Sequence, residues 1–402
     1  MFKAVRVAFF LAPKAIVRGN LGISLLTIGM LAIVAMNLLF VPGLLNGIVN
    51  GSNKLLVETY SGDIIVESQK DNPYISHIKD LVSDIETVEG VVAASARNTI
   101  GAKIEYYDEK VSCSIIAISP EKDEKVFDIS KYMMEGEFLD PRDREQIMLG
   151  IQLAGADLKN IELYSSSLRN VHANDKVTVV YANGVQRKYT VKGIFYSKFI
   201  QTDIQAFITD LEYQCIVPIA KDRATSIRVK LDGNVDPSVV IASISNLQDG
   251  LKFKTWVETA GIIKSMADSF QAIKQILDIV NILVAGITVF IVTYVDVVNR
   301  RRQIGIQRAI GIKSYAITMS YIIRAFFYAI LGIIAGIIFY RYVLIPFENQ
   351  HPFTFPIGPA YLSMEPYLVA RTIVILVLVS LFASFIPVWR VMRKSILDAI
   401  WG

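Results

Sequence analysis

The sequence predicts an α-helical membrane protein with four transmembrane helices and a large mixed α/β extracytoplasmic domain inserted between helices 1 and 2. The first observation is composition: of 402 residues, 53% are hydrophobic and 19% are charged, and the mean hydropathy is +0.43. Such a composition excludes a disordered chain and is unusual for a soluble protein. The second observation is a set of four long apolar stretches. The third is one long polar region, opposite in charge to the remainder.

The four apolar stretches reach the roughly 20 residues that a helix needs to cross a bilayer. They predict transmembrane helices at residues 19–46, 271–299, 315–345 and 367–392. The first stretch has no charged residue between Arg18 and Lys54. It is too long for the apolar part of a signal peptide, so we interpret it as a retained helix. Residues 346–366 then form a short outer loop.

Charge sets the expected orientation. Residues 44–270 hold 25 basic and 32 acidic residues, whereas the remainder holds 16 basic and 5 acidic residues. Most of these basic residues precede the first span, cluster at 300–313, or follow the fourth span. The positive-inside rule therefore places both termini and the 300–314 loop in the cytoplasm, and the acidic region outside. Residues 1–18 are expected to form an amphipathic helix on the inner membrane surface, and residues 393–402 a cytoplasmic tail.

The outer region, residues 47–270, reads as a mixed α/β domain. A strand–helix–strand pattern at 63–96 recurs at 226–256, which predicts one split layer made of residues 55–148 and 218–258. Residues 149–217 between them form a strand-rich insert.

Within the insert, strands at 177–181 and 185–195 are joined by Asn183-Gly184, a pair typical of a type I′ hairpin. Cys113 and Cys215 both fall in the outer region, where a disulfide is chemically allowed. Two buried thiols are the alternative, which we slightly favour.

No catalytic constellation is present in the sequence. Gly305 to Ser314 resembles a phosphate-binding loop, but five residues rather than four separate its glycines, and Ile312 stands between Gly311 and Lys313. The acidic residues are dispersed as on a solvated surface. We therefore expect no enzymatic activity, no bound metal and no cofactor on this chain. The histidines are too scattered for a metal centre: His77, His172 and His351.

The segment from Asn299 to Thr318 is the most informative part of the chain. It predicts a short basic amphipathic helix leaving the second span, which Gly311 would end. Ile306 and Ile310 would share one edge of this helix. The simplest interpretation of a basic cluster here is an anchor at the inner membrane surface.

The exact string resembles the loop after the second helix in MacB/LolC-type ABC transporter permeases, a family that includes FtsX-like proteins. That family's pattern is roughly E-R-x-R-E-I-G-I-L-R-A-L-G-A. Gln303 stands where an acidic residue is common, and Ile312 replaces a small one. Thr255-Trp256, residues 148–154 and residues 384–400 also resemble family segments. The residues that match in the loop are Arg301, Arg302, Ile304, Gly305, Ile306, Arg308, Ala309 and Gly311.

The resemblance implies a type VII ABC transporter permease of the prokaryotic cytoplasmic membrane. In that family, ATP and Mg bind to a separate cytoplasmic ABC ATPase, a second permease copy completes a homodimer or related heterodimer, and membrane lipids surround the helices; no nucleic acid is involved. The outer domain would be MacB-like, with a porter-like part. The loop at 300–314 would be the coupling helix that docks on the ATPase, through Arg301, Arg302, Gln303, Ile304, Gly305, Ile306, Gln307, Arg308, Ala309, Ile310 and Gly311.

The resemblance favours export or extraction of a hydrophobic or lipid-linked substrate, such as a lipoprotein, peptide or drug. The alternative is an FtsX-like transducer that regulates an extracytoplasmic enzyme, although FtsX-like outer domains are typically smaller. A sensor that signals to a kinase is a third class, but the chain carries no cytoplasmic signalling module.

Charged residues in the spans leave several pairings open. Asp296 lies four residues before Arg300, and Lys274 four before Asp278, so ion pairs within one helix explain both. Asp296 of the second span could instead pair with Arg324 of the third. Arg371 is near an outer interface and can extend to it. Gly332-x-x-x-Gly336 permits close helix packing, within the chain or in a dimer.

Overall fold

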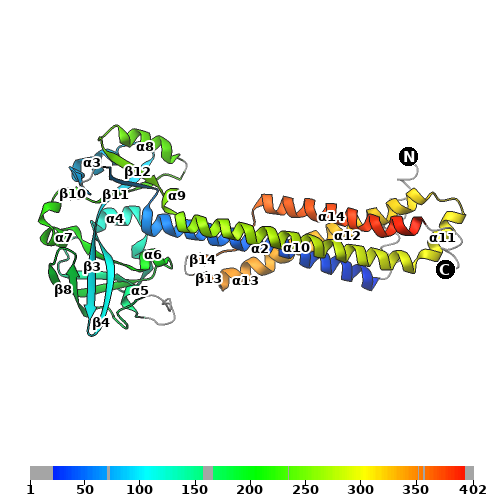
Figure 1. The fold of residues 1–402 in the computed structure, drawn as a ribbon, viewed down its shortest axis with the longest axis horizontal. Coiled ribbons are helices and arrows are strands. Elements are labelled where there is room, and N and C mark those ends of the chain that lie inside the picture. Colours follow the sequence, from blue (N-terminus) through cyan, green and yellow to red (C-terminus); the bar gives the residue numbers. More distant parts are fainter. Residues whose placement is uncertain are drawn as a thin grey trace. The chain divides into compact units, whose positions relative to one another are not determined.

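The computed structural model describes residues 21–69, 73–156, 166–233, 235–351, 353–355 and 358–393. It divides into two compact units (Figure 1). One contains the apolar helices, and the other, residues 48–265 with 354–359, contains the α/β domain. The predicted interfacial helix at 1–18 and the tail after Arg393 lie outside the described residues.

Four helices in the described chain are long and apolar enough to cross a membrane. They are α2 (Leu21–Leu55), α10 (Gly261–Asn299), α12 (Ser314–Phe339) and α14 (Pro366–Met392). A π-helical turn η4 (Tyr340–Leu344) and α13 (Ile345–Gln350) prolong α12. The short helix α11 (Arg301–Ala309) lies between α10 and α12. These elements confirm the predicted fold class, with the α/β domain between the first and second apolar helices.

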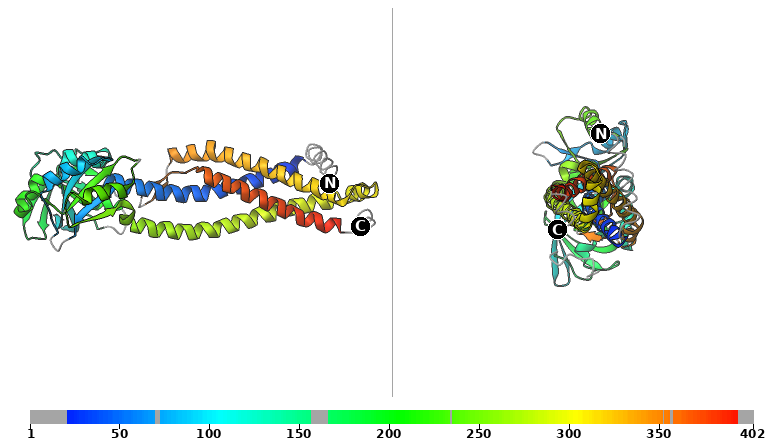
Figure 2. Two further views of the ribbon diagram at one scale, coloured as in Figure 1. Left: turned by 90° about the horizontal axis from the view of Figure 1, so that it is seen from above. Right: turned by 90° about the vertical axis from the view of Figure 1, so that its right-hand side faces the viewer.

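The core of the helical unit draws on all four of these helices. Ala35 of α2, Ala285 of α10, Ile333 of α12 and Leu376 of α14 belong to one buried cluster. Helices α12 and α14 lie side by side along much of their length (Figure 2).

Gly332 and Gly336 face α2 of the same chain. A Cβ at Gly332 would lie 2.6 Å from the Leu31 Cβ, and one at Gly336 would lie 2.7 Å from the Ala32 carbonyl oxygen. Both distances are too short for any side chain, so the glycines let α12 approach α2 closely. Of the two alternatives that the sequence left open, the structure therefore gives an intrachain contact.

The first part of the outer domain is a four-stranded layer covered by two helices. Strands β1 (Ile64–Ser68), β3 (Val91–Tyr106), β11 (Ser226–Leu231) and β12 (Leu251–Thr255) are antiparallel, in the order β12-β1-β11-β3. The two strand–helix–strand units thus interleave. Apolar residues of α3 (Ile78–Glu86) and α8 (Pro237–Ser245), spaced three or four apart, pack on the sheet.

The second part of the outer domain continues the same sheet from β3, which extends ten residues beyond its predicted end at Ala96. Its order onward is β4-β9-β6-β8-β5, and β7 pairs with β3 and β8. The small strands β2 (Ile75–Ser76) and β10 (Arg223–Ala224) pair separately. The strands of this part are β4 (Glu109–Ile118), β5 (Met133–Gly136), β6 (Gln146–Gly150), β7 (Lys176–Tyr181), β8 (Gln186–Phe195) and β9 (Gln205–Thr209).

Short helices and turns complete the outer domain and the connection after α13. They are η1 (Leu56–Ser61), α4 (Pro120–Val126), η2 (Ile129–Tyr132), α5 (Ile151–Ala154), α6 (Ile200–Asp203), α7 (Asp210–Ile216), η3 (Pro218–Ala220) and α9 (Trp256–Thr259), with strands β13 (Phe353–Phe355) and β14 (Gly358–Ala360).

The predicted hairpin of β7 and β8 forms, but its turn is not type I′. A type I′ turn needs positive φ at both central residues, whereas only Gly184 has positive φ, at +85°. The Tyr181 amide donates to the Val185 carbonyl, and the Gly184 amide donates to the Tyr181 carbonyl. The loop therefore has three residues and ends with a left-handed glycine, a common hairpin alternative.

The two cysteines are both free thiols. Cys215 is exposed, so the prediction of two buried thiols is wrong for that residue, and no disulfide joins the pair. Cys113 is largely buried, and burial raises the pKa of its thiol to about 12.

A fragment of residues 50–264 is expected to fold as a soluble domain when expressed alone. It holds nearly the whole outer unit and its three largest buried clusters, and a domain of this size can bury a sufficient core. The measurement is thermal unfolding of the purified monomeric fragment, for which we expect one cooperative transition. Broad unfolding without a transition would contradict an autonomous domain.

Candidate functional site

Helix α11 has a well-defined end. The Gly311 amide donates to the Arg308 carbonyl, and the Ile312 amide donates to the Gln307 carbonyl. Gly311 itself has φ +93°, a conformation that favours glycine. Together these bonds form the Schellman motif, which satisfies the last carbonyl groups of a helix. The loop that the sequence singled out is therefore an ordered helix with a sharp stop.

One side of α11 is anchored in the helical unit. Ile304 is only 2% exposed and packs in a cluster that includes Val297 of α10, Ile317 of α12 and Val388 of α14. Gly305 is also buried. Ile304 thus connects α11 to three of the apolar helices, α10, α12 and α14.

The opposite side of α11 presents two isoleucines to its surroundings. Ile306 is 49% exposed and Ile310 is 72% exposed. These two side chains are therefore available to a covering surface, either a partner protein or lipid. The other exposed residues of the predicted docking set are Arg301, Arg302, Gln303, Ala309 and Gly311, while Gln307 and Arg308 are half-buried.

Asp296 holds two arginines near the start of α11. Its Oδ1 accepts from the Arg300 Nε at 2.9 Å, and its Oδ2 lies 2.7 Å from the Arg324 Nη1. The structure thus brings together Asp296 and Arg324, the intramembrane pair raised from the sequence, and also forms the pair four residues apart. One carboxylate links the residue preceding α11 to α10 and α12.

Beyond Arg324, polar contacts continue to α2. Arg324 lies 3.5 Å from the Tyr328 hydroxyl, and that hydroxyl lies 2.9 Å from the Ser24 hydroxyl. A cavity of about 30 Å³ adjoins these groups, room for about one or two water molecules. Arg324 is 7% exposed, and its Nε has no hydrogen-bond partner among the described residues. Charged residues within membrane helices usually face such an interior.

A second ion pair joins two of the apolar helices, and the sequence analysis did not predict it. Asp278 of α10 pairs with Arg371 of α14, not with Lys274 in its own helix, and Arg371 therefore does not simply extend to the interface. The only feature of the sequence that could have indicated this pair is that the two opposite charges lie near the ends of two predicted spans. Spacing within one helix offered a nearer partner, and pairing between helices depends on rotations that spacing does not reveal.

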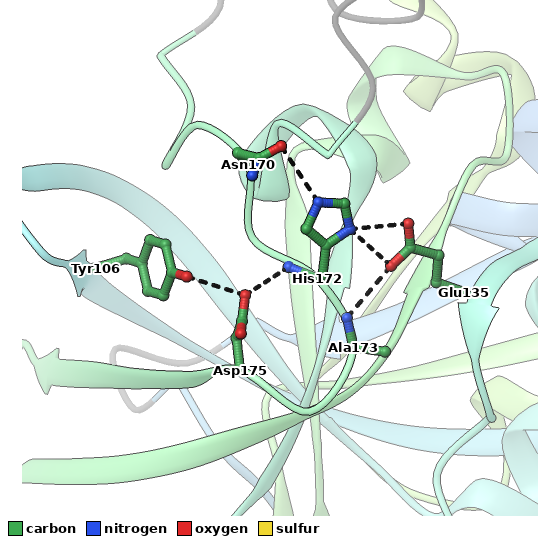
Figure 3. Close-up of polar contacts among 6 residues, drawn as sticks. All are labelled: Tyr106, Glu135, Asn170, His172, Ala173 and Asp175. Atoms are coloured by element: carbon green, nitrogen blue, oxygen red, sulfur yellow. Dashed lines mark hydrogen bonds and ion pairs between the residues drawn. The ribbon is translucent and has the colours of Figure 1, made fainter.

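The outer domain carries a polar cluster around His172, which Figure 3 shows. Its Nδ1 lies 3.1 Å from both carboxylate oxygens of Glu135, and its Nε2 lies 3.2 Å from the Asn170 Oδ1. The His172 amide donates to Asp175, which also accepts from the Tyr106 hydroxyl. This network fastens the segment before β7 to β3 and β5. Within the described residues, no group of three or more potential ligands could hold a metal ion.

Residues 277–396 match the model of the FtsX-like permease C-terminal family. The match contains α11, α12 and α14, and it confirms the predicted resemblance to FtsX-like ABC transporter permeases. Together with the four apolar helices, it supports a permease subunit of an ABC transporter. The comparison with curated proteins gives no match.

Three solved structures are similar to about half of the chain. The periplasmic region of MacB from Actinobacillus actinomycetemcomitans is 11% identical, with 52% of this chain and 98% of that chain covered and a TM-score of 0.36. The extracellular domain of the noncanonic ABC-type transporter YknZ from Gram-positive bacteria is 9% identical. The match covers 48% of this chain and 100% of that chain, with a TM-score of 0.34. A domain of a putative permease protein from Porphyromonas gingivalis is 15% identical. The match covers 48% of this chain and 87% of that chain, with a TM-score of 0.31.

Proposed function

We propose that this chain couples ATP hydrolysis by a separate cytoplasmic ABC ATPase to movement of its outer domain, and that it exports or extracts a hydrophobic or lipid-linked substrate. ATP and Mg would bind to the ATPase, and a second permease copy, identical or related, would complete the transporter. The observation that carries the proposal is α11: Ile304 anchors the helix, while Ile306 and Ile310 remain available to a partner.

The energetics of this surface favour a protein partner. Full burial of such a side chain contributes about 1.5–3 kcal/mol, so covering the exposed parts of Ile306 and Ile310 would contribute roughly 1–2 kcal/mol each. The arginines around them suit a rim of polar contacts, which steers association more than it adds affinity. Asp296 would transmit a displacement of α11, because it joins Arg300 at the start of that helix to Arg324 of α12.

Site-specific photo-crosslinking tests the proposal. A photoreactive residue is placed at Ile310 and, as a control, at Tyr107, which is 87% exposed in the outer domain. We expect an ABC ATPase to be captured from position 310 and not from position 107 when membranes of the native host are irradiated. If position 310 captures only lipid, α11 is a surface anchor and the coupling proposal is overturned. Co-purification of a cell-wall hydrolase, without lipid or lipoprotein, would favour the alternative regulatory function.

The proposed orientation places both termini in the cytoplasm and the α/β domain outside. In intact cells, we expect Cys215 to react with a membrane-impermeant maleimide, because it is exposed, and Cys113 to stay unreacted, because burial raises its thiol pKa to about 12. In a Cys215→Ser background, Asp249→Cys should label from outside and Ser314→Cys only after permeabilisation. Labelling of Ser314→Cys in intact cells would reverse the topology.

A further inference from the structure

A buried aromatic residue, Phe199, connects the strand-rich part of the outer domain to the outer ends of α2 and α10. Phe199 is 0% exposed and belongs to one cluster with Leu55, Leu56, Ala260 and Ile263. These four residues lie where α2 continues into η1 and where α9 leads into α10, and all of them belong to the outer unit. Helices α6 and α9 both contact η1 there (Figure 1).

Two side-chain contacts of η1 strengthen this attachment. The Tyr60 ring lies edge-on to the Phe199 ring, with 6.3 Å between the ring centres. The Thr59 hydroxyl donates to the Leu55 carbonyl, so the Thr202 hydroxyl of α6, 2.9 Å away, is the donor of the pair that these two hydroxyls form. Both threonines are 0% exposed. Packing and hydrogen bonding thus both attach α6 to η1.

The turn that carries Phe199 is held firmly within the strand-rich part. The Asp203 Oδ1 accepts from the Ser197 amide at 2.8 Å and from the Ser197 hydroxyl at 2.7 Å. The Phe199 carbonyl accepts from the amides of Thr202 and Asp203. A Cβ at Gly150, the last residue of β6, would lie 2.1 Å from the Asp203 carbonyl oxygen, so α6 packs directly on the backbone of that strand. The position of Phe199 is therefore fixed relative to β6.

The strand-rich part has no direct covalent link to the apolar helices. The chain passes from α2 through η1 into β1, and from β12 through α9 into α10, and both of these strands belong to the four-stranded layer. A displacement of α2 or α10 can therefore reach the strand-rich part by two routes. One is the shared strand β3, and the other is the contact at Phe199.

We propose that Phe199 is a positioning residue that makes the strand-rich part move together with the outer ends of α2 and α10. Without this contact, the strand-rich part would be held through the sheet alone and would tilt independently of the helices. The inference rests on the proposed coupling to an ATPase, for which it names the contact that carries the movement to the strand-rich part.

Spin-label distances in the full-length protein test the inference. In a Cys215→Ser background, labels are attached at Lys54→Cys of α2 and at Tyr107→Cys of the strand-rich part, two exposed positions of the outer unit. Cys113 stays unlabelled, because burial raises its thiol pKa to about 12. We expect a single narrow distance distribution for the parent protein and one at least about twice as wide for Phe199→Ala, which leaves a cavity in the cluster.

Three further variants separate the contact from a general loss of packing. Phe199→Leu keeps most of the buried volume and should restore the narrow distribution. Phe207→Ala removes an equally buried phenylalanine from a different cluster of the outer domain, so it should leave the distribution narrow. Thr202→Val keeps the shape of the side chain but loses the bond to Thr59, and an intermediate width is expected. Circular dichroism checks folding, and Phe199→Val takes the place of Phe199→Ala if that variant does not fold.

The same labels distinguish this inference from the coupling proposal. When ATP and vanadate are added with the ATPase captured at position 310, the distance should stay unchanged in the parent protein and should shift or broaden further in Phe199→Ala. A distance that changes in the parent protein, a narrow distribution in Phe199→Ala, or equal broadening in Phe207→Ala would each overturn the inference. If position 310 captures no ATPase, the coupling proposal fails, while the distances without nucleotide still decide whether Phe199 holds the strand-rich part.

Discussion

Ile306→Asp is expected to abolish docking of the ATPase while leaving the chain folded and inserted. Ile306 is 49% exposed, so the substituted carboxylate stays hydrated in the isolated subunit. In the docked complex, the same carboxylate would be buried without a partner, at a cost on the order of several kcal/mol. The measurement is a detergent pull-down of the ATPase, with ATP hydrolysis followed in parallel.

Two further variants sharpen this prediction. Arg308→Ala should have a smaller effect, seen mainly in the salt dependence of binding, because a charge at the rim of an interface acts mostly on encounter. Ile304→Asp introduces the same carboxylate at a position that is 2% exposed, and it should reduce the amount of folded protein instead of docking alone. If Ile306→Asp retains full ATPase binding and normal substrate-stimulated turnover, the assignment of α11 as a coupling helix fails.

Asp123→Ala is expected to destabilise the outer domain by about 3–5 kcal/mol, the usual effect of leaving one partner of a buried ion pair unpaired. Asp123 accepts from the Nε and Nη2 of Arg97, both at 2.8 Å, and the two residues are 0% and 1% exposed. The Arg97 guanidinium also stacks on Phe127, 3.6 Å from its ring centre. The pair fastens α4 to β3, the strand that both parts of the sheet share.

Urea unfolding of fragment 50–264 measures this effect; the full-length protein in detergent serves if the fragment is insoluble. Glu105→Ala is the matched control, since Glu105 lies 3.1 Å from Lys110 in a pair that solvent reaches. An exposed pair of this kind contributes about 1 kcal/mol or less, so the two variants should differ clearly. If the two variants unfold at the same urea concentration, the buried ion pair stabilises the outer domain no more than the exposed pair does.

Local patterns in the sequence predicted much of the fold. The second predicted strand–helix–strand pattern, at 226–256, begins with β11 at Ser226. Within the first pattern, at 63–96, α3 follows the apolar spacing of Ile78, Leu81, Val82 and Ile85. Helix α11 and its glycine stop were also expected, because the capping of a helix depends on adjacent residues. Such features are decided within one or two turns of chain, where periodicity and capping chemistry are readable.

Features that depend on distant residues were not predictable in the same way. Asp278 finds its partner 93 residues away in Arg371, although Lys274 stands one turn before it. The Asn183-Gly184 hairpin has a three-residue loop, and the length of such a loop is coupled to the register of the two strands that it joins.

The pairing of β1 with β12 has a consequence for how the outer domain can be exchanged. Ile64 lies opposite Thr255, so the chain enters and leaves this domain on neighbouring antiparallel strands. A domain whose ends are adjacent can be inserted into another chain at a single point. The segment between α2 and α10 thus meets the geometric condition for exchange with another domain whose first and last strands lie side by side.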